Sequence, residues 1–256
     1  MALLSTIVYP GGKTRAAEQI LSLFPPRTNR LVSPFFGGGS VETLAARNGW
    51  RVHGSDAFGA LVEYHQMTQL YSKALFKRVW DFYPPNRATT ERMRKGYYEI
   101  ADPIDRAAAF FMLNRTSLAG FTLAKSGFCT EFPSFQPSRI DILDQWEWPA
   151  TLSIEELDCK DALARHPNVA AYLDPPYPIP NMLYGDEDDE TQAFDHVGLA
   201  DCLKARSAPW VLSYNDHPMV LELYKDFKIL KPKWNYSMVK AQALVQRFCD
   251  IIILNF

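Results

Sequence analysis

Short apolar runs and longer amphipathic stretches alternate along most of the chain. Strands are predicted at 30–33, 51–56, 152–157, 169–173, 210–214, 227–230 and 248–254, most of which are rich in apolar residues. Apolar residues at helical spacing predict helices at 41–48, 57–80, 89–100, 104–113, 199–205 and 219–224. Strands interleaved with helices indicate an α/β fold with a mostly parallel sheet, and we expect the last strand to pair antiparallel at its edge.

The region 57–150 departs from this alternation because it is mostly helical. A hairpin pattern lies within it at 121–132, where apolar residues alternate on either side of Lys125-Ser126-Gly127. We therefore expect one discontinuous domain formed by 1–56 and 151–256, interrupted by a helical insertion at 57–150.

The composition permits a sizeable core and excludes several classes of protein. The 256 residues are 47% hydrophobic, and no apolar run approaches the roughly twenty residues that span a membrane. The first residues do not resemble a secretory signal, so we expect a cytoplasmic protein. The four cysteines lack C-x-x-C spacing and the five histidines do not cluster, so we expect free thiols and no metal site.

The most informative motif is Asp174-Pro175-Pro176-Tyr177, which follows the apolar strand at 169–173. Proline fixes φ and lacks an N–H, so this turn holds its carbonyl groups outward. The Asp174 carboxylate and one such carbonyl can accept hydrogen bonds from the exocyclic amine of a flat base, on which Tyr177 can stack. The alternative interpretation is a strand that ends in a turn, with Tyr177 as packing.

A glycine turn, Gly37-Gly38-Gly39, lies between the strand at 30–33 and the helix at 41–48. This order brings the backbone close to a nucleotide-like ligand. Asp56 ends the next strand about twenty residues later, at the spacing of a ribose-binding carboxylate. The glycines do not form G-x-G-x-x-G, and no Lys-Ser/Thr follows them, so a nucleoside fits better than a polyphosphate. A plain tight turn, and a helix N-cap at Asp56, are the alternatives.

Lys13 follows Gly11-Gly12 in a segment that we interpret as the opening of a helix. Backbone amides and a lysine at such a position form an anion site. The alternative is a solvated lysine at a helix start.

The net charge of −2 argues against a nucleic-acid partner, but the distribution of charge is uneven. Seven basic and two acidic residues lie between Lys73 and Lys95, and six basic residues and one acidic residue lie from Lys225 to Arg247. Each segment is either a solvated face or a surface that contacts phosphates.

Four segments in this order resemble the Dam-type, or D12 class, adenine-specific DNA methyltransferases: Tyr9-Pro10-Gly11-Gly12-Lys13, Pro34-Phe35-Phe36-Gly37-Gly38-Gly39, Asp56, and Asp174-Pro175-Pro176-Tyr177. The resemblance spans nearly the whole chain, with weaker echoes at 113–115 and 212–216. It implies a methyltransferase-type (Rossmann-like) α/β sheet with 57–150 as the target-recognition region. It also implies methyl transfer from S-adenosylmethionine to N6 of an adenine flipped out of duplex DNA.

The resemblance assigns roles residue by residue. Asp174, Pro175, Pro176 and Tyr177 are the expected catalytic residues. The expected cofactor contacts are Tyr9, Lys13, Phe35, Gly37, Gly39, Asp56 and Asp174, with Lys13 paired to the methionine carboxylate. The expected DNA contacts are Lys73, Arg87, Arg92, Arg94, Arg115, Lys125 and Lys240.

The chain departs from the family at two places. Ser33 stands where an acid usually precedes Pro-Phe, which weakens an expected contact to the amino group of the cofactor. Residues 116–120 differ from the aromatic and amide residues that touch DNA in Dam-like members, so the recognised DNA sequence stays open.

We expect the enzyme to act as a monomer on duplex DNA, and the sequence leaves open whether a cognate restriction endonuclease accompanies it. Three alternatives also stay open. The first is an N4-cytosine methyltransferase, which more often has Ser in place of Asp174. The second is an RNA adenine methyltransferase, which commonly has Asn there. The third is a catalytically silent DNA-binding relative.

Overall fold

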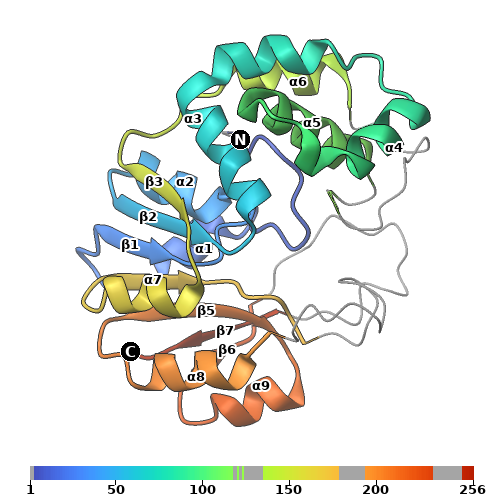
Figure 1. The fold of residues 1–256 in the computed structure, drawn as a ribbon. Helices are drawn as coiled ribbons and strands as arrows, with labels where there is room; N and C mark the ends of the chain where they lie inside the picture. Colours follow the sequence, from blue (N-terminus) through green and yellow to red (C-terminus); the bar gives the residue numbers. More distant parts are fainter. Residues whose placement is uncertain (1–2, 118–119, 121–122, 124–134, 179–193, 233–249) are drawn as a thin grey trace.

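The computed structural model describes residues 3–117, 120, 123, 135–178, 194–232 and 250–256. This part of the chain forms a seven-stranded sheet in the order β3-β2-β1-β4-β5-β7-β6 (Figure 1). The strands are β1 (Arg30–Ser33), β2 (Arg51–Asp56), β3 (Leu152–Glu156), β4 (Ala170–Leu173), β5 (Trp210–Asn215), β6 (Lys228–Leu230) and β7 (Asp250–Leu254). The five strands from β3 to β5 are parallel, and β7 runs antiparallel to both β5 and β6. The expected methyltransferase-type α/β sheet is confirmed.

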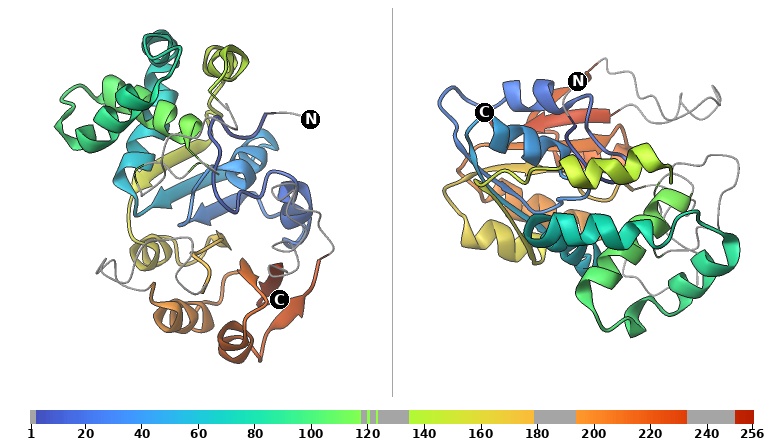
Figure 2. Two further views of the ribbon diagram at one scale, coloured as in Figure 1. Left: turned by 90° about the vertical axis from the view of Figure 1, so that its right-hand side faces the viewer. Right: turned by 90° about the horizontal axis from the view of Figure 1, so that it is seen from above.

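Helices cover both faces of the sheet (Figure 2). Successive strand residues point to opposite faces, so one strand can contribute apolar side chains to a core on each side. Leu31 packs into the core under α1 (Ala17–Ser22) and α2 (Ser40–Arg47), whereas Val32 packs into the core on the other face. That second core is covered by α7 (Cys159–Arg165), α8 (His196–Lys204) and α9 (Pro218–Leu223). Apolar side chains on both faces of β1, β4, β5 and β7 therefore hold helices on either side of the sheet, which gives three layers (Figure 2).

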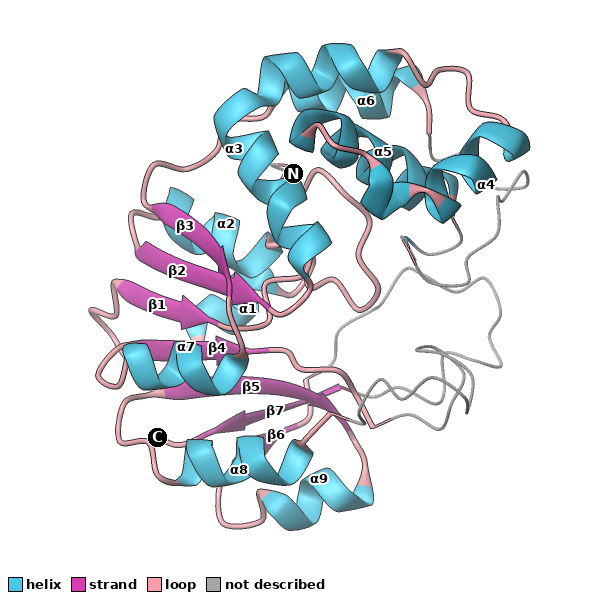
Figure 3. Cartoon of the chain, in the orientation of Figure 1, coloured by secondary structure: helices cyan, strands magenta, loops and turns pink. Residues whose placement is uncertain are grey.

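A helical region follows β2 (Figure 3). Its buried apolar residues form a core of their own. It comprises α3 (Gly59–Trp80), α4 (Arg87–Lys95), a 3₁₀ turn (Tyr97–Glu99), α5 (Pro103–Thr116) and α6 (Pro137–Gln145). The Asp102 carboxylate caps α5 by accepting from the amides of Ile104 and Asp105, and Pro103 occupies the first turn, where its missing N–H costs nothing. From Ala107 onward α5 is buried, so this helix is the centre of the region.

The N-terminal segment ties this helical region to the sheet. The Asn114 side chain bonds both backbone polar groups of Val8, at 3.0 Å to the amide and 2.7 Å to the carbonyl. The Thr6 hydroxyl lies 2.7 Å from the Tyr64 hydroxyl. Residues beside the glycine-lysine segment are thus anchored on α3 and α5, so the region helps to position that segment.

Several predicted elements have different limits. The Lys13 segment does not open a helix, because α1 begins only at Ala17. The last strand is antiparallel as expected, but it lies between β5 and β6, and β6 is the edge. The helix predicted at 89–100 ends at Lys95, where Gly96 leaves the helical conformation. The patterns did not predict α6 or α7, and the hairpin at 121–132 lies almost wholly outside the described residues.

β1 lies between β2 and β4. The chain adds β2 and β3 on one side of β1 and then crosses over to add β4 and β5 on the other side. In open parallel sheets, ligands bind at the carboxyl ends of the strands where the order reverses in this way. The glycine turn follows β1, Asp56 ends β2 and Asp174 follows β4. Within the described residues, no helix is long and apolar enough to cross a lipid bilayer.

Candidate active site

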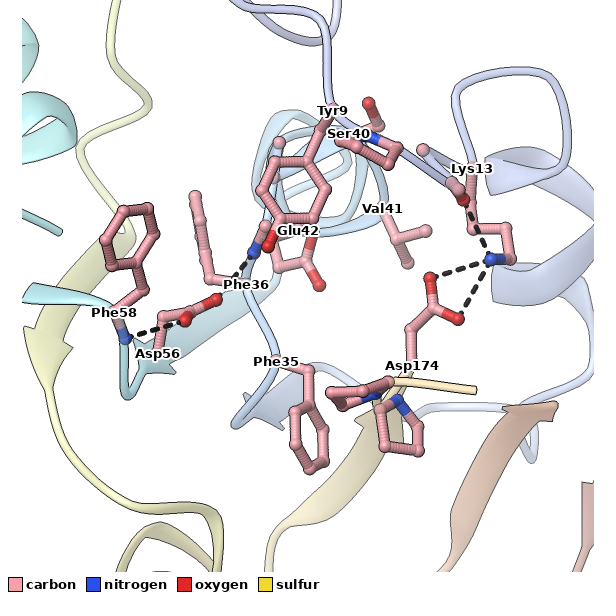
Figure 4. Close-up of a pocket in the computed structure, with 18 of the residues that line it drawn as sticks. Tyr9, Lys13, Phe35, Phe36, Ser40, Val41, Glu42, Asp56, Phe58 and Asp174 are labelled. Carbon is pink, nitrogen blue, oxygen red and sulfur yellow. Dashed lines mark hydrogen bonds and ion pairs between the residues drawn. The ribbon is translucent and has the colours of Figure 1, made fainter. Parts of the chain in front are cut away.

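A cavity of about 290 Å³ opens at the carboxyl ends of β1, β2 and β4 (Figure 4). Its described lining comes from the N-terminal loop, the glycine turn and the start of α2, the end of β2 and the turn after β4. The helical region adds Phe110 of α5, Gly120 and Leu123. All residues expected to contact the cofactor or to act in catalysis lie in it: Tyr9, Lys13, Phe35, Gly37, Gly39, Asp56, Asp174, Pro175, Pro176 and Tyr177. The fold thus joins segments that are separated by up to 168 residues of sequence, from Tyr9 to Tyr177.

The glycine turn depends on conformations and space that other residues lack. Gly37 and Gly39 have φ of +51° and +69°. A Cβ on Gly37 would lie 2.8 Å from the Tyr9 ring, and a Cβ on Gly39 would overlap the Phe36 ring. The turn is therefore enclosed by two aromatic rings that only glycine permits this close.

Asp56 fixes the turn from the neighbouring strand. Its carboxylate accepts hydrogen bonds from the amides of Gly37 and Phe58, each at 3.0 Å. Burial raises the pKa of Asp56, while these backbone hydrogen bonds oppose that shift. Asp56 thus couples the end of β2 to the glycine turn and also lies in the cavity wall.

His65 supports the same turn from α3. Its Nε2 lies 2.9 Å from the Gly37 carbonyl oxygen, and burial lowers the pKa of His65 to about 4. The ring is therefore neutral at physiological pH and can donate its Nε2–H to the carbonyl. Asp56 and His65 together satisfy both backbone polar groups of Gly37.

Lys13 and Asp174 form an ion pair across the cavity. The Lys13 Nζ lies 2.9 and 2.8 Å from the two carboxylate oxygens, and it also donates to the Gly11 carbonyl at 2.8 Å. The Lys13 side chain is only 4% exposed and that of Asp174 19%. The motif carboxylate is therefore held in a defined orientation by a buried ammonium group.

The remainder of the motif lies beside this pair. Pro175 is buried, Pro176 is exposed and Tyr177 is half-buried. The Tyr177 hydroxyl donates to Asp174 at 3.2 Å, and the Lys13 Nζ lies 5.2 Å from the centre of the Tyr177 ring. An aromatic ring, a carboxylate and an ammonium group are thus adjacent at the end of β4.

Glu42, on α2, places a third carboxyl group in the cavity wall. The residue is 2% exposed, and the Ser33 hydroxyl donates to its Oε1 at 2.5 Å. Burial raises the pKa of Glu42 to about 7, with the nearby charges of Asp174 and Asp56 adding to the effect and the Ser33 hydrogen bond opposing it. A carboxyl group therefore does lie beside Ser33, but it belongs to Glu42 on α2.

The expected DNA contacts meet different outcomes. Arg115 is buried: it is 4% exposed, donates to the Thr6 carbonyl and has its guanidinium 5.4 Å from the Phe111 ring centre, so its DNA contact stays a prediction. Every residue of α5 from Ala107 to Thr116 is buried, so Arg115 is enclosed with the rest of the helix. Lys73 is exposed and bonds Asp144 at 2.8 Å. On α4, Arg87 and Arg92 are exposed and Arg94 is half-buried, whereas Lys125 and Lys240 lie outside the described residues.

Sequence reasoning missed several lining or supporting residues. Phe36, Phe58 and Glu42 line the cavity, and His65 holds the turn behind it. The aromatic pair next to the glycines was visible as a signal, but a glutamate and a histidine inside helices look like ordinary surface or core positions. Across the described residues, no group of three or more His, Cys, Asp or Glu side chains is placed to hold a metal ion.

A family model for D12 class N6 adenine-specific DNA methyltransferases matches residues 9–238. The type II methyltransferase M1.LlaDCHI of Lactococcus lactis subsp. cremoris is 23% identical over 277 residues, which cover 97% of this chain and 94% of that protein. The DNA N-6-adenine-methyltransferase of Escherichia phage P1 is 24% identical over 242 residues, covering 87% of this chain but only 31% of that protein. A solved hypothetical protein of Thermus thermophilus covers 94% of this chain and 82% of its own at 14% identity, but its TM-score of 0.36 is too low to support an argument.

Proposed function

Because the chain belongs to the D12 class of N6 adenine-specific DNA methyltransferases, we propose that it moves a methyl group from S-adenosylmethionine to the N6 amine of an adenine flipped out of duplex DNA. Membership of this class implies a methyl donor and action on DNA. The observation that carries the finer proposal is the cavity that joins Asp174, the glycine turn and Asp56 at the switch point of the sheet.

The residues in the cavity fit the chemistry of S-adenosylmethionine. Asp56, at the end of β2, suits a ribose hydroxyl, and the rings of Phe36 and Phe58 suit the faces or edges of an adenine. Lys13 suits a carboxylate. When bound, S-adenosylmethionine supplies a methyl group on a positively charged sulfur, which is a strong electrophile.

The chain's own part in the reaction is to hold the target amine. The Asp174 carboxylate and the Pro175 carbonyl accept hydrogen bonds from the two N–H groups of this amine. The lone pair on its nitrogen is then directed away from the adenine ring. Tyr177 stacks on the base, which must leave the duplex at a cost of a few kcal/mol. Positioning and fixed electrostatics supply the acceleration, without a covalent enzyme intermediate.

The ion pair of Lys13 and Asp174 gives this proposal a further requirement. Both Asp174 oxygens accept from Lys13 in the structure, so a target amine competes with Lys13 for the same acceptors. We propose that Lys13 turns toward the cofactor carboxylate, which frees one Asp174 oxygen for the amine. Binding of cofactor and of the flipped base would then reinforce one another.

The decisive experiment is incubation of the purified protein with unmethylated genomic DNA and S-adenosylmethionine, followed by single-molecule sequencing of modified bases. N6-methyladenine confined to one short motif is the expected result. N4-methylcytosine, or methylation of RNA alone, would replace the proposed substrate. Absence of any modification together with absence of cofactor binding would overturn the proposal in favour of a silent DNA-binding relative.

A further inference from the structure

Glu42 is a buried acid with no ionic partner among the described residues. It lies in the first turn of α2, is 2% exposed, and contributes to the cavity wall. Within the described residues, no lysine, arginine or histidine pairs with it. Lys13, the cationic side chain in the described lining, is bonded to Asp174 instead.

Such a position is costly for a carboxylate in the absence of a ligand. Removing an ionised carboxylate from water is unfavourable unless it is paired or well hydrogen-bonded. Ser33 supplies one hydrogen bond to Glu42, and the helix N-terminus supplies a favourable field. The neighbouring Asp56 and Asp174 carboxylates act in the opposite direction. An acid held under these conditions favours the arrival of a cation.

The cavity is lined by both the Glu42 carboxyl group and the Lys13 ammonium group. Figure 4 shows the Glu42 carboxyl group directed into the space between Asp56 and Asp174, and Lys13 on the Asp174 side. A carboxyl group and an ammonium group lining one cavity match a zwitterion, the state of a free α-amino acid group at neutral pH.

We propose that Glu42 binds the α-ammonium group at the amino-acid end of the methyl donor, opposite the α-carboxylate that Lys13 receives. The inference rests on the proposed function, because it takes S-adenosylmethionine as the ligand. It assigns a cofactor-binding role to a residue on α2, whereas the position at the end of β1 that precedes Pro34 carries only the Ser33 hydroxyl. Ser33 orients Glu42 by its hydrogen bond.

The test compares two ligands and needs no turnover. Calorimetry would measure the binding of S-adenosylhomocysteine and of its deaminated analogue, which lacks the α-ammonium group, to the wild type and to Glu42→Gln. Glutamine keeps the shape and an acceptor for Ser33 but cannot carry charge. The wild type is expected to prefer the amino-bearing ligand at least tenfold, and Glu42→Gln is expected to lose that preference while binding the analogue as well as before. Glu147→Gln, at an exposed carboxylate outside the cavity lining, is the matched control.

The pH dependence gives a second readout. The unliganded Glu42 has a pKa of about 7, so binding of a cation beside it should release a proton and become tighter as pH rises from 6 to 8. Among the described residues, the other charged groups in the cavity wall are Asp56, Asp174 and Lys13, and we expect these to contact the deaminated analogue equally. Proton release should therefore occur with S-adenosylhomocysteine and not with the analogue.

Equal discrimination between the ligands by the wild type and Glu42→Gln would overturn the inference and leave Glu42 as a buried structural acid. If Glu42→Gln does not fold, proton release by the wild type tests the inference instead. Equal proton release on binding of the two ligands would overturn the inference. Failure of both ligands to bind the wild type would overturn the cofactor proposal itself, and this inference with it.

Discussion

The cavity at the end of the sheet and the surface of the helical region hold charged residues in opposite ways. In the cavity, Lys13, Glu42 and Asp56 are enclosed and each has defined hydrogen-bond partners. On α4, Arg87 and Arg92 stand in solvent. Charges in an enclosed site interact strongly with a few neighbours, whereas exposed charges are screened and largely interchangeable. We therefore expect function in the first region to depend on individual residues, and DNA binding by the second to depend on its total charge.

The largest effect that would sharpen this contrast is expected at Asp174. Asp174→Ala removes the acceptor for the target amine, and methyl transfer measured with radiolabelled cofactor should fall by more than about a thousandfold. Activity within tenfold of the wild type would contradict the proposed role. DNA affinity, measured by fluorescence anisotropy, should stay nearly unchanged.

Asp174→Ala also leaves the buried Lys13 ammonium without its carboxylate partner, so thermal unfolding must be checked alongside activity. Asp174→Asn is the matched control, because it retains the size of the side chain and an oxygen acceptor. We expect Asp174→Asn to be more stable than Asp174→Ala and still severely impaired in transfer.

The second effect concerns Tyr177. Stacking of a base on an aromatic side chain is worth about 1–3 kcal/mol, so Tyr177→Ala should lower kcat/KM by roughly ten- to a hundredfold. Tyr177→Phe keeps the ring, loses only the hydrogen bond to Asp174, and should cost much less. Equal losses in the two variants would show that the hydroxyl, not the stacked ring, carries the effect.

A third, smaller effect is expected in the glycine turn, where two variants distinguish the cost of a positive φ from the cost of steric overlap with a neighbouring ring. Gly39→Ala adds a Cβ that overlaps the Phe36 ring, in a residue with φ of +69°. Gly49→Ala is the control, since Gly49 has φ of +85° but nothing lies within 4 Å of its added Cβ.

The left-handed conformation alone costs a non-glycine residue about 1–2 kcal/mol, so Gly49→Ala should lower the free energy of unfolding by about that amount and leave ligand binding intact. Gly39→Ala should lose more stability and also weaken binding of S-adenosylhomocysteine. Identical behaviour of the two variants in calorimetry and chemical denaturation would show that the rings adapt.

The smallest effects are expected on the surface of the helical region. Arg92→Ala should weaken DNA binding only a few-fold at physiological salt and reduce the slope of log affinity against log salt by about 1. Lys73→Ala should change less, because that ammonium bonds Asp144. Arg165→Ala, which removes an exposed arginine from α7, is the matched control. A loss from Arg92→Ala as large as that from Asp174→Ala would break the contrast between the two regions.

Sequence patterns succeeded where the signal was local. Strands were predicted just before Gly37 and Asp174 and up to Asp56, and the structure has strands at all three places. Parallel pairing then gathers the three segments at one end of the sheet, so the predicted cofactor and catalytic residues line one cavity. The burial of Arg115 could not be predicted, for the complementary reason: charge is a property of one residue, but burial is decided by the packing of α3 against α5.

The sequence by itself determined the alternation of strands and helices, the glycine turn and the Asp-Pro-Pro-Tyr motif, because each depends on neighbouring residues and on the intrinsic conformations of glycine and proline. Only the tertiary structure decided that Lys13 reaches Asp174, that His65 holds Gly37, and that Glu42 stands in the corner beside Ser33. Except for Ser33 and Glu42, which sit on successive elements, these pairs join residues remote in sequence. Their contacts exist because the sheet order and the packing of helices on it bring the elements together.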